Sequence, residues 1–175
     1  MKFDLNNPRV LAMTAVMTAL VLALTRPIVP TPVGYTHLGD VAIYFAAFAF
    51  GPWAGLVAGG LGTALADVLT GAYAFFAPLS LIVHGVQAFV AGAIYRRIPT
   101  PLGVLLGLLA GGLIVIGGYF AGEFLVPVWG GPAGAIGELP FNAVQVLVGS
   151  LGGLVYLAVA RVYPRLSHLG EQPHS

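Results

Sequence analysis

The residues of this sequence that could do chemistry come mostly in pairs spaced three or four positions apart. Residues at these spacings share one face of a helix, so both members of a pair can act on the same molecule. Carboxylates, amides, imidazoles and phenols together donate and accept hydrogen bonds, which suits them to hold a small polar ligand. The pairs are His37 with Asp40, His84 with Gln87, Tyr119 with Glu123 and Asn142 with Gln145, joined by the single residues Tyr35, Asp67 and Tyr73.

Known catalytic patterns are missing around these residues. The sequence has no cysteine and no Gly-x-Ser-x-Gly, His-Glu-x-x-His or Gly-x-x-x-x-Gly-Lys-Ser/Thr motif. The spacings of its histidines and carboxylates match no established metal site. We therefore expect a binding protein rather than an enzyme, with no metal, no cofactor and no ATPase of its own. A membrane enzyme that uses the carboxylates and histidines as acid and base is the less favoured alternative.

The composition places these polar residues in a membrane protein. Of the 175 residues, 58% are hydrophobic and 7% are charged, against roughly 25% charged residues in an ordinary soluble domain. A soluble fold of this size could not bury so much apolar surface. Long apolar runs exclude the alternating pattern of an outer-membrane barrel. The net charge of +1 gives no reason to expect binding to nucleic acid.

The charge-free runs, divided by proline and glycine, predict an all-α domain over residues 1–165 with six transmembrane helices. Residues 166–175 are expected to form a short cytoplasmic tail. The second helix is short for a hydrocarbon layer of ~30 Å, so we expect non-helical chain from residues 31–39 beside it, buried in protein or facing water. The helices are predicted at about 8–28, 36–50, 52–70, 77–95, 102–126 and 139–162.

The basic residues predict the orientation of the chain. Six of them fall on one side of the six-helix arrangement, and only Arg26 falls on the other. The positive-inside rule then places both termini in the cytoplasm. Five helices bring their polar pairs toward the opposite side, so we expect an outward-facing polar cavity. The six basic residues on the cytoplasmic side are Lys2, Arg9, Arg96, Arg97, Arg161 and Arg165.

Small residues recur at four-residue spacing on three of the predicted helices. Such rows let helix backbones approach closely in lipid. For the glycine rows of the third and fifth helices we favour packing inside the bundle. For the alanine row of the first helix, packing inside the bundle and contact with a partner both stay open on this pattern alone. The rows are Ala15, Ala19 and Ala23; Gly51, Gly55 and Gly59; and Gly103, Gly107 and Gly111.

Several short motifs, in their order and spacing, resemble the substrate-binding S-components of energy-coupling factor (ECF) vitamin transporters. The resemblance covers nearly the whole chain and is strongest to the riboflavin-transporter-like group that includes hydroxymethylpyrimidine and pyridoxine carriers. The motifs are Tyr35-Thr-His-Leu-Gly-Asp40, Phe50-Gly-Pro-Trp-Ala-Gly55, Ala64-Leu-Ala-Asp67, His84-Gly-Val-Gln87, Gly118-Tyr-Phe-Ala-Gly-Glu123 and Pro140-Phe-Asn-Ala-Val-Gln145.

This resemblance implies a multi-pass protein of the prokaryotic cell membrane. Such a protein binds a vitamin near the outer surface, under the loop between helices one and two, and works with a membrane scaffold subunit and two cytosolic ATPases. Ala15 and Ala19 match the family's Ala-x-x-x-Ala contact with the scaffold, which favours partner binding for the alanine row that also includes Ala23. Relatives often carry Lys then Glu where this chain has His84 and Gln87, so a different substrate or a less charged site is expected.

The charges near the expected cavity constrain the ligand. Asp40, Asp67 and Glu123 lie there with no lysine, and only Arg26 is near. Anionic ligands normally recruit arginine or lysine. We therefore predict a neutral or cationic heterocycle, such as a pyridoxine-type compound or hydroxymethylpyrimidine. A stand-alone carrier for a similar molecule, working without ATPase subunits, is the alternative.

Overall fold

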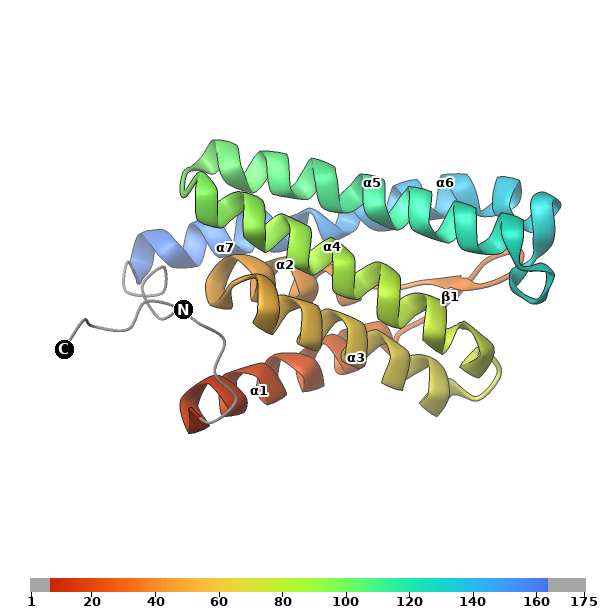
Figure 1. Ribbon diagram of the computed structural model, residues 1–175, viewed down its shortest axis with the longest axis horizontal. Helices are drawn as coiled ribbons and strands as arrows, with labels where there is room; N and C mark the ends of the chain where they lie inside the picture. Colours follow the sequence, from red (N-terminus) through yellow and green to blue (C-terminus); the bar gives the residue numbers. More distant parts are fainter. Residues whose placement is uncertain (1–6, 164–175) are drawn as a thin grey trace.

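The computed structural model describes residues 7–163 as a bundle of α-helices with one two-stranded hairpin (Figure 1). The tail expected at residues 166–175 lies outside this range. Strands β1 (Val29–Pro30) and β2 (Tyr35–Thr36) pair antiparallel. Two short 3-10 turns, η1 (Ala74–Phe76) and η2 (Pro127–Trp129), precede α4 and α6. The helices are α1 (Pro8–Thr25), α2 (Gly39–Phe50), α3 (Pro52–Thr70), α4 (Ala77–Arg97), α5 (Pro101–Leu125), α6 (Gly131–Gly149) and α7 (Leu151–Val162).

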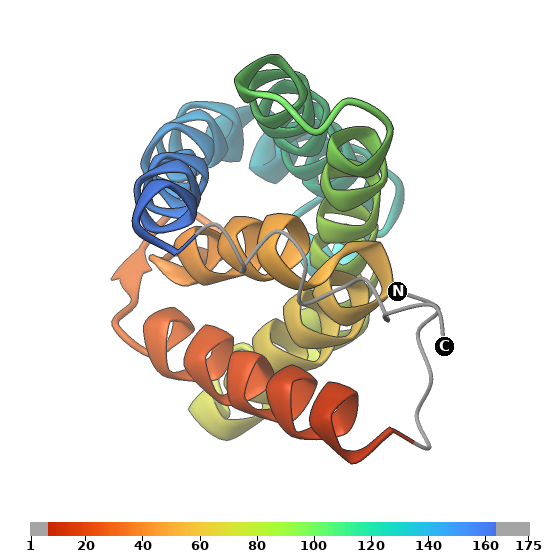
Figure 2. The same cartoon turned by 90° about the vertical axis from the view of Figure 1, so that its left-hand side faces the viewer.

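Among residues 7–163, five helical segments are long and apolar enough to cross a membrane: Pro8–Thr25, Pro52–Thr70, Ala74–Arg97, Pro101–Leu125 and Gly131–Val162. The helix α2 is shorter, because its 12 residues extend only about 18 Å. Figure 2 looks along the bundle and shows α2 at its centre, with the other helices around it. The predicted all-α membrane fold with six helices is confirmed when α6 and α7 are counted as one interrupted helix.

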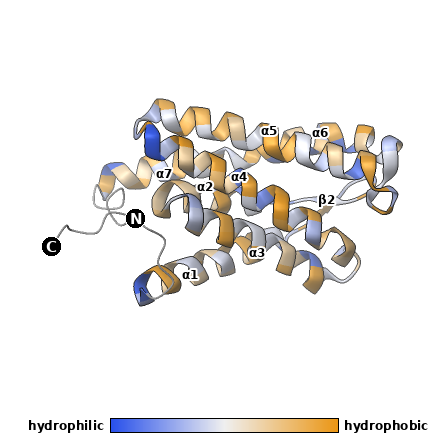
Figure 3. Cartoon of the chain, viewed as in Figure 1, coloured by the Kyte–Doolittle hydropathy of each residue, from blue (hydrophilic) through white to orange (hydrophobic). Residues whose placement is uncertain are grey.

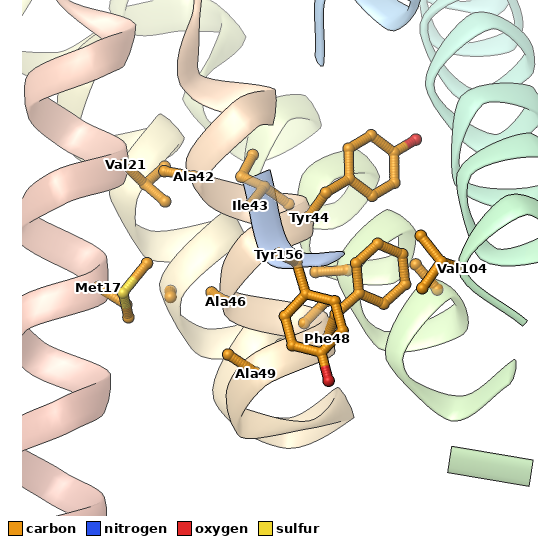
Figure 4. Close-up of a cluster of buried hydrophobic side chains, with 14 residues drawn as sticks. Met17, Val21, Ala42, Ile43, Tyr44, Ala46, Phe48, Ala49, Val104 and Tyr156 are labelled. Carbon is orange, nitrogen blue, oxygen red and sulfur yellow. The ribbon is translucent and has the colours of Figure 1, made fainter. Parts of the chain in front are cut away.

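The hydrophobic core is built around α2. Figure 4 shows its side chains meeting those of α1, α5 and α7. Tyr44 and Ile43 are fully buried, and their neighbours on the same helix are mostly alanine, so the surrounding helices can approach closely. The labelled members of this cluster are Met17, Val21, Ala42, Ile43, Tyr44, Ala46, Phe48, Ala49, Val104 and Tyr156.

Glycine allows the closest helix contacts in the bundle. A Cβ atom on Gly59 of α3 would lie 2.8 Å from the carbonyl oxygen of His84 on α4. A Cβ on Gly107 of α5 would lie 3.0 Å from the carbonyl oxygen of Ala91. Distances this short leave no room for a larger residue, so the glycine rows of α3 and α5 pack inside the bundle, as predicted.

The chain between α1 and α2 folds over one end of the bundle. We call this the hairpin end; the α3–α4 and α5–α6 connections also lie there (Figure 1). The second predicted helix begins at Gly39 rather than 36, because Tyr35 and Thr36 pair with β1 instead. The first ends at Thr25 rather than 28, since Pro27 has no N–H to continue the helical ladder.

The last predicted helix, 139–162, is wrong at its start and in its continuity. It begins at Gly131, so most of the chain expected between the fifth and sixth predicted helices is helical, and Pro140 lies inside α6 rather than at its first turn. It is interrupted at Ser150, whose hydroxyl donates to the Val146 carbonyl at 2.8 Å. Glycine and serine together are a common cause of such a kink. The other predicted boundaries differ by two residues at most.

Strongly hydrophilic residues mark the end opposite the hairpin. Figure 3 shows them at the start of α1 and at the α4–α5 turn, while most of each helix between the two ends is apolar. These are the positions of Arg9, Arg96 and Arg97. The basic residues of the described helices that were expected on one side of a membrane therefore share one end of the fold, far from the hairpin end.

Candidate functional site

A polar cavity lies under the hairpin, between α3, α4, α5 and α6. Most of the residues around it can form hydrogen bonds, although they come from the apolar helices of a membrane protein. The cavity leaves only about 20 Å³ open to the centres of water molecules, which is room for one or two. Its lining consists of Gly34, Tyr35, His37, Asp67, Phe76, Ser80, Tyr119, Glu123, Glu138, Asn142 and Gln145.

Seven of the eleven residues proposed from the sequence line this cavity. The other four lie next to it: Asp40, His84 and Gln87 are fully buried behind the lining, and Tyr73 packs on Tyr35, with ring centres 4.7 Å apart. The seven lining residues are Tyr35, His37, Asp67, Tyr119, Glu123, Asn142 and Gln145.

The buried residues behind the cavity are connected by hydrogen bonds and by one ion-pair contact, between Asp40 and His84. Asp40 Oδ1 lies 3.1 Å from His84 Nδ1, and Asp40 Oδ2 accepts from Gln145 Nε2 at 3.1 Å. His84 Nδ1 also lies 2.8 Å from Gln87 Oε1. Both neighbours of Nδ1 are oxygen acceptors, so this nitrogen carries a proton. Asp40 lies in the first turn of α2, where the helix dipole favours a negative charge.

The network reaches the cavity a second time through Tyr119. His84 Nε2 lies 3.1 Å from the Tyr119 hydroxyl, which lies 2.8 Å from the Ser80 hydroxyl. Both Tyr119 and Ser80 line the cavity. The hydroxyl of a buried tyrosine needs such partners, because an unpaired polar group in a low-dielectric interior is costly.

The hairpin is fastened to the helices below it by polar contacts. Tyr35 donates a short hydrogen bond to Asp67 on α3. The backbone N–H of Val33, near the hairpin turn, donates to Glu138 Oε1 on α6 at 2.9 Å. Burial and the adjacent Asp67 raise the pKa of the Tyr35 phenol well above its usual value. The phenol therefore keeps its proton and remains the donor to Asp67.

His37, which precedes α2, is held in one neutral form. Its Nδ1 accepts the backbone N–H of Gly39 at 3.1 Å. Burial is the main cause that lowers the pKa of His37 from 6.5 to about 4, and nearby His84 lowers it further, against the opposing effect of Asp40. At neutral pH the ring therefore carries its proton on Nε2 and can donate from that atom.

Three residues of the lining hold polar atoms with no protein partner. Asp67 Oδ2, Glu123 Oε2 and Asn142 Nδ2 are buried and make no hydrogen bond within the described chain. Buried polar groups are nearly always paired, so these atoms indicate a missing partner. The set comprises two acceptors and one donor, all on the same cavity.

Three residues of the lining, Gly34, Ser80 and Glu138, were not predicted from the sequence. Glu138 was not selected because an acidic residue near an expected helix start has an ordinary role as a cap. Ser80 had no signal, since a serine in a helix usually bonds to its own backbone. Gly34 contributes backbone surface, which sequence alone cannot assign to a site. Phe76 is one of the aromatic residues expected at the rim of the cavity, and it does line it.

A second, larger cavity of about 420 Å³ lies beside the first, between the end of α1, the hairpin and α6. Its walls are mostly apolar. His37 and Gln145 line both cavities, so these two side chains separate the polar space from the apolar one. No cluster of His, Cys, Asp and Glu residues suited to a metal ion occurs among residues 7–163.

The alanine row of α1 faces away from the bundle. Ala15, Ala19 and Ala23 are all exposed, whereas α1 packs on its neighbours through the opposite face. The row is therefore not used for packing within the described fold. The residues that α1 does bury are Val10, Thr14, Met17, Val21 and Thr25.

Comparisons with known proteins agree on one family. Residues 6–161 match the family described as ECF-type riboflavin transporter, S component. The chain is 38% identical over 152 residues to the thiamine precursor transporter HmpT of Lactococcus lactis, covering 83% of this chain and 84% of that protein. It is 34% identical over 145 residues to an uncharacterized Pyrococcus woesei protein from the gap 3′ region, covering 82% and 95%.

A solved structure has the same fold. It is described as the S component of a bacterial ECF transporter and superposes with a TM-score of 0.70, over 93% of this chain and 97% of that one. The two sequences are only 21% identical, so this similarity concerns the arrangement of the helices and not the ligand.

Proposed function

This chain belongs to the family of S components of ECF-type riboflavin transporters, and from that premise we propose that it captures a thiamine precursor, hydroxymethylpyrimidine, outside the cell. Membrane transport of a vitamin or vitamin precursor follows from the family. The identity of the ligand is our proposal, and the name of the relative HmpT supports it.

The observation that carries this proposal is the set of unpartnered atoms on the cavity. Asp67 Oδ2 and Glu123 Oε2 require donors, and Asn142 Nδ2 requires an acceptor. Hydroxymethylpyrimidine has an exocyclic amino group and a hydroxyl that donate, and ring nitrogens that accept. A ligand with this pattern satisfies the buried groups that otherwise lack partners. The carboxylates and the lack of lysine or arginine in the lining favour a neutral or cationic ring over an anionic one.

The size of the cavity supports a ligand with a single ring. With room for one or two waters, the lining must move outward to admit any heterocycle. A pyrimidine needs a modest displacement of the hairpin. Riboflavin has three fused rings and a ribityl chain, so it would also have to extend past His37 and Gln145 into the apolar cavity.

We assign the entrance to the hairpin end. The distribution of basic residues supports an orientation with this end on the outside. The hairpin covers the cavity and has two fastenings, Tyr35–Asp67 and Val33–Glu138. Lifting it exposes the lining without separating the helices. The opposite end, where α1 begins and α7 ends, then faces the cytoplasm, in the multi-pass arrangement of a prokaryotic cell membrane.

Release of the ligand inside the cell requires a source of energy, which we assign to an ECF scaffold subunit and two cytosolic ATPases. We propose that the exposed row of Ala15, Ala19 and Ala23 contacts the scaffold. Small side chains on a lipid-facing helix allow a partner helix to approach closely, and this row has no packing role within the described bundle.

Calorimetric titration of the purified protein tests the ligand. We expect tight binding of hydroxymethylpyrimidine and much weaker binding of riboflavin. Asn142→Leu should weaken binding by about 5- to 150-fold, the penalty of an unpaired ligand acceptor. Thr70→Val is the matched control, because Thr70 lies at the same end but bonds to its own helix at Ala66. Binding of riboflavin with higher affinity than hydroxymethylpyrimidine would refute the proposal.

A further inference from the structure

We infer that Asp40, although it does not touch the cavity, is a positioning residue that fixes which hydrogen bonds Gln145 offers to the ligand. This inference rests on the proposed function, because it concerns the selectivity of the same site. Its consequence is that the ligand edge facing Gln145 must carry a hydrogen-bond donor.

The orientation of the Gln145 amide follows from its partner. A carboxylate oxygen accepts hydrogen bonds, so the atom of Gln145 that lies 3.1 Å from Asp40 Oδ2 is the amide nitrogen. One N–H of the amide is then used by Asp40, and we infer that the carbonyl oxygen Oε1, on the other side of the amide, faces the cavity. Gln145 therefore acts on the ligand as an acceptor, although an amide could otherwise act as either.

Asp40 is itself held in one position by the surrounding network. It is fully buried, and its other oxygen lies 3.1 Å from His84 Nδ1. On its opposite side α6 passes so closely that a Cβ on Gly149 would clash with the Asp40 side chain. The carboxylate cannot turn away to release Gln145. Asp40, which lies behind the lining, therefore determines that Gln145 acts as an acceptor toward the cavity.

The selectivity of the site follows from the balance of donors and acceptors. Gln145 Oε1 joins Asp67 Oδ2 and Glu123 Oε2 as a third acceptor, against two donors of the lining, Asn142 Nδ2 and His37 Nε2. A heterocycle that donates more hydrogen bonds than it accepts on this side is preferred. The amino form of hydroxymethylpyrimidine meets this requirement, and an analogue with a carbonyl in place of the amino group does not.

The substitution Asp40→Asn inverts the proposed arrangement without changing the shape of the side chain. The oxygen of the new amide can still face His84 Nδ1, while its NH₂ group replaces the oxygen that faces Gln145. Gln145 must then turn its carbonyl toward that NH₂ group and present its own NH₂ to the cavity. The site would lose an acceptor and gain a donor at this position.

Titrations with the amino compound and its carbonyl analogue test this inference. We expect the ratio of the two affinities to shift toward the analogue by about tenfold or more in Asp40→Asn. In a Gln145→Leu background, Asp40→Asn should leave the ratio unchanged, because its effect passes through Gln145. An equal loss for both ligands in Asp40→Asn would show that Asp40 only stabilises the fold, and would overturn the inference.

A measurement on the ligand-free protein tests the role of Asp40 independently of the identity of the ligand. The side-chain amide protons of Gln145, identified by their loss in Gln145→Leu, should show the downfield NMR shift of a hydrogen bond to a carboxylate in the wild-type protein. If the wild type binds neither compound, the proposed ligand is wrong, and the NMR signal still decides the role of Asp40. A signal at the position of a solvent-exposed amide would overturn that role.

Discussion

The contact between Glu138 and the hairpin offers a direct test of how the cavity is closed. Glu138 is buried, with 3% of its surface exposed, and its Oε1 accepts the Val33 N–H at 2.9 Å. The two residues are 105 positions apart in the chain, so the bond exists only while the hairpin lies against α6. Glu138→Leu removes the acceptor and leaves the hairpin otherwise unchanged.

The expected effect follows from the charge of the acceptor. A hydrogen bond to a charged group contributes about 1.5–3 kcal/mol, so its loss raises the population of the open hairpin about 10- to 150-fold. Glu138→Gln keeps an acceptor oxygen but removes the charge, so its effect should be clearly smaller. Association and dissociation of the ligand both require the hairpin to open, so both should accelerate in Glu138→Leu.

Two assays measure this opening. Hydrogen exchange of the Val33 amide in the ligand-free protein reports the hairpin directly, and stopped-flow dissociation reports its effect on the ligand. Glu138 also lines the cavity, so an effect on dissociation alone could come from lost ligand contacts. If Val33 exchanges at the same rate in Glu138→Leu as in the wild type, the contact does not hold the hairpin closed.

Three further outcomes follow from the structure. Because His37 has its pKa lowered to about 4, the folded state should lose stability as pH falls from 6.5 toward 4, by about 1.4 kcal/mol per unit, and His37→Gln should flatten that slope in unfolding titrations. Asp67→Asn should weaken binding of a protonated ligand more than that of a neutral analogue, measured by calorimetry; equal losses would make Asp67 only an acceptor. Ala15→Trp with Ala19→Trp should leave ligand affinity nearly intact but abolish assembly with the scaffold in co-purification, whereas Leu113→Trp, on an equally exposed face of α5, should not.

The sequence predicts the helices well, because apolar runs of about 20 residues bounded by proline, glycine or charged residues are typical of transmembrane helices. The prediction of a helix boundary fails where the same residue type is found at two kinds of position. Pro140 is a common first residue of a helix, yet it lies inside α6, which begins at Gly131. The strands of the hairpin contain two residues each, too few for any periodic pattern to show.

Most residues of the candidate site could also be predicted from the sequence. Polar residues are costly inside a membrane, and the helix face on which each lies follows from its spacing. It does not separate residues that line the cavity from those behind it. His84 and Gln145 have similar signals in the sequence, but only Gln145 lines the cavity. That difference depends on the rotation of α4 and α6 against their neighbours, which spacing along one helix does not determine.

Capture of a thiamine precursor in the polar cavity under the hairpin can be tested directly by native mass spectrometry. The protein would be purified from cells supplied with both hydroxymethylpyrimidine and riboflavin. We expect one retained molecule with the mass of hydroxymethylpyrimidine, lost in Asn142→Leu and kept in Thr70→Val. Retention of riboflavin instead would contradict this function. So would retention of hydroxymethylpyrimidine to the same extent in Asn142→Leu and Thr70→Val.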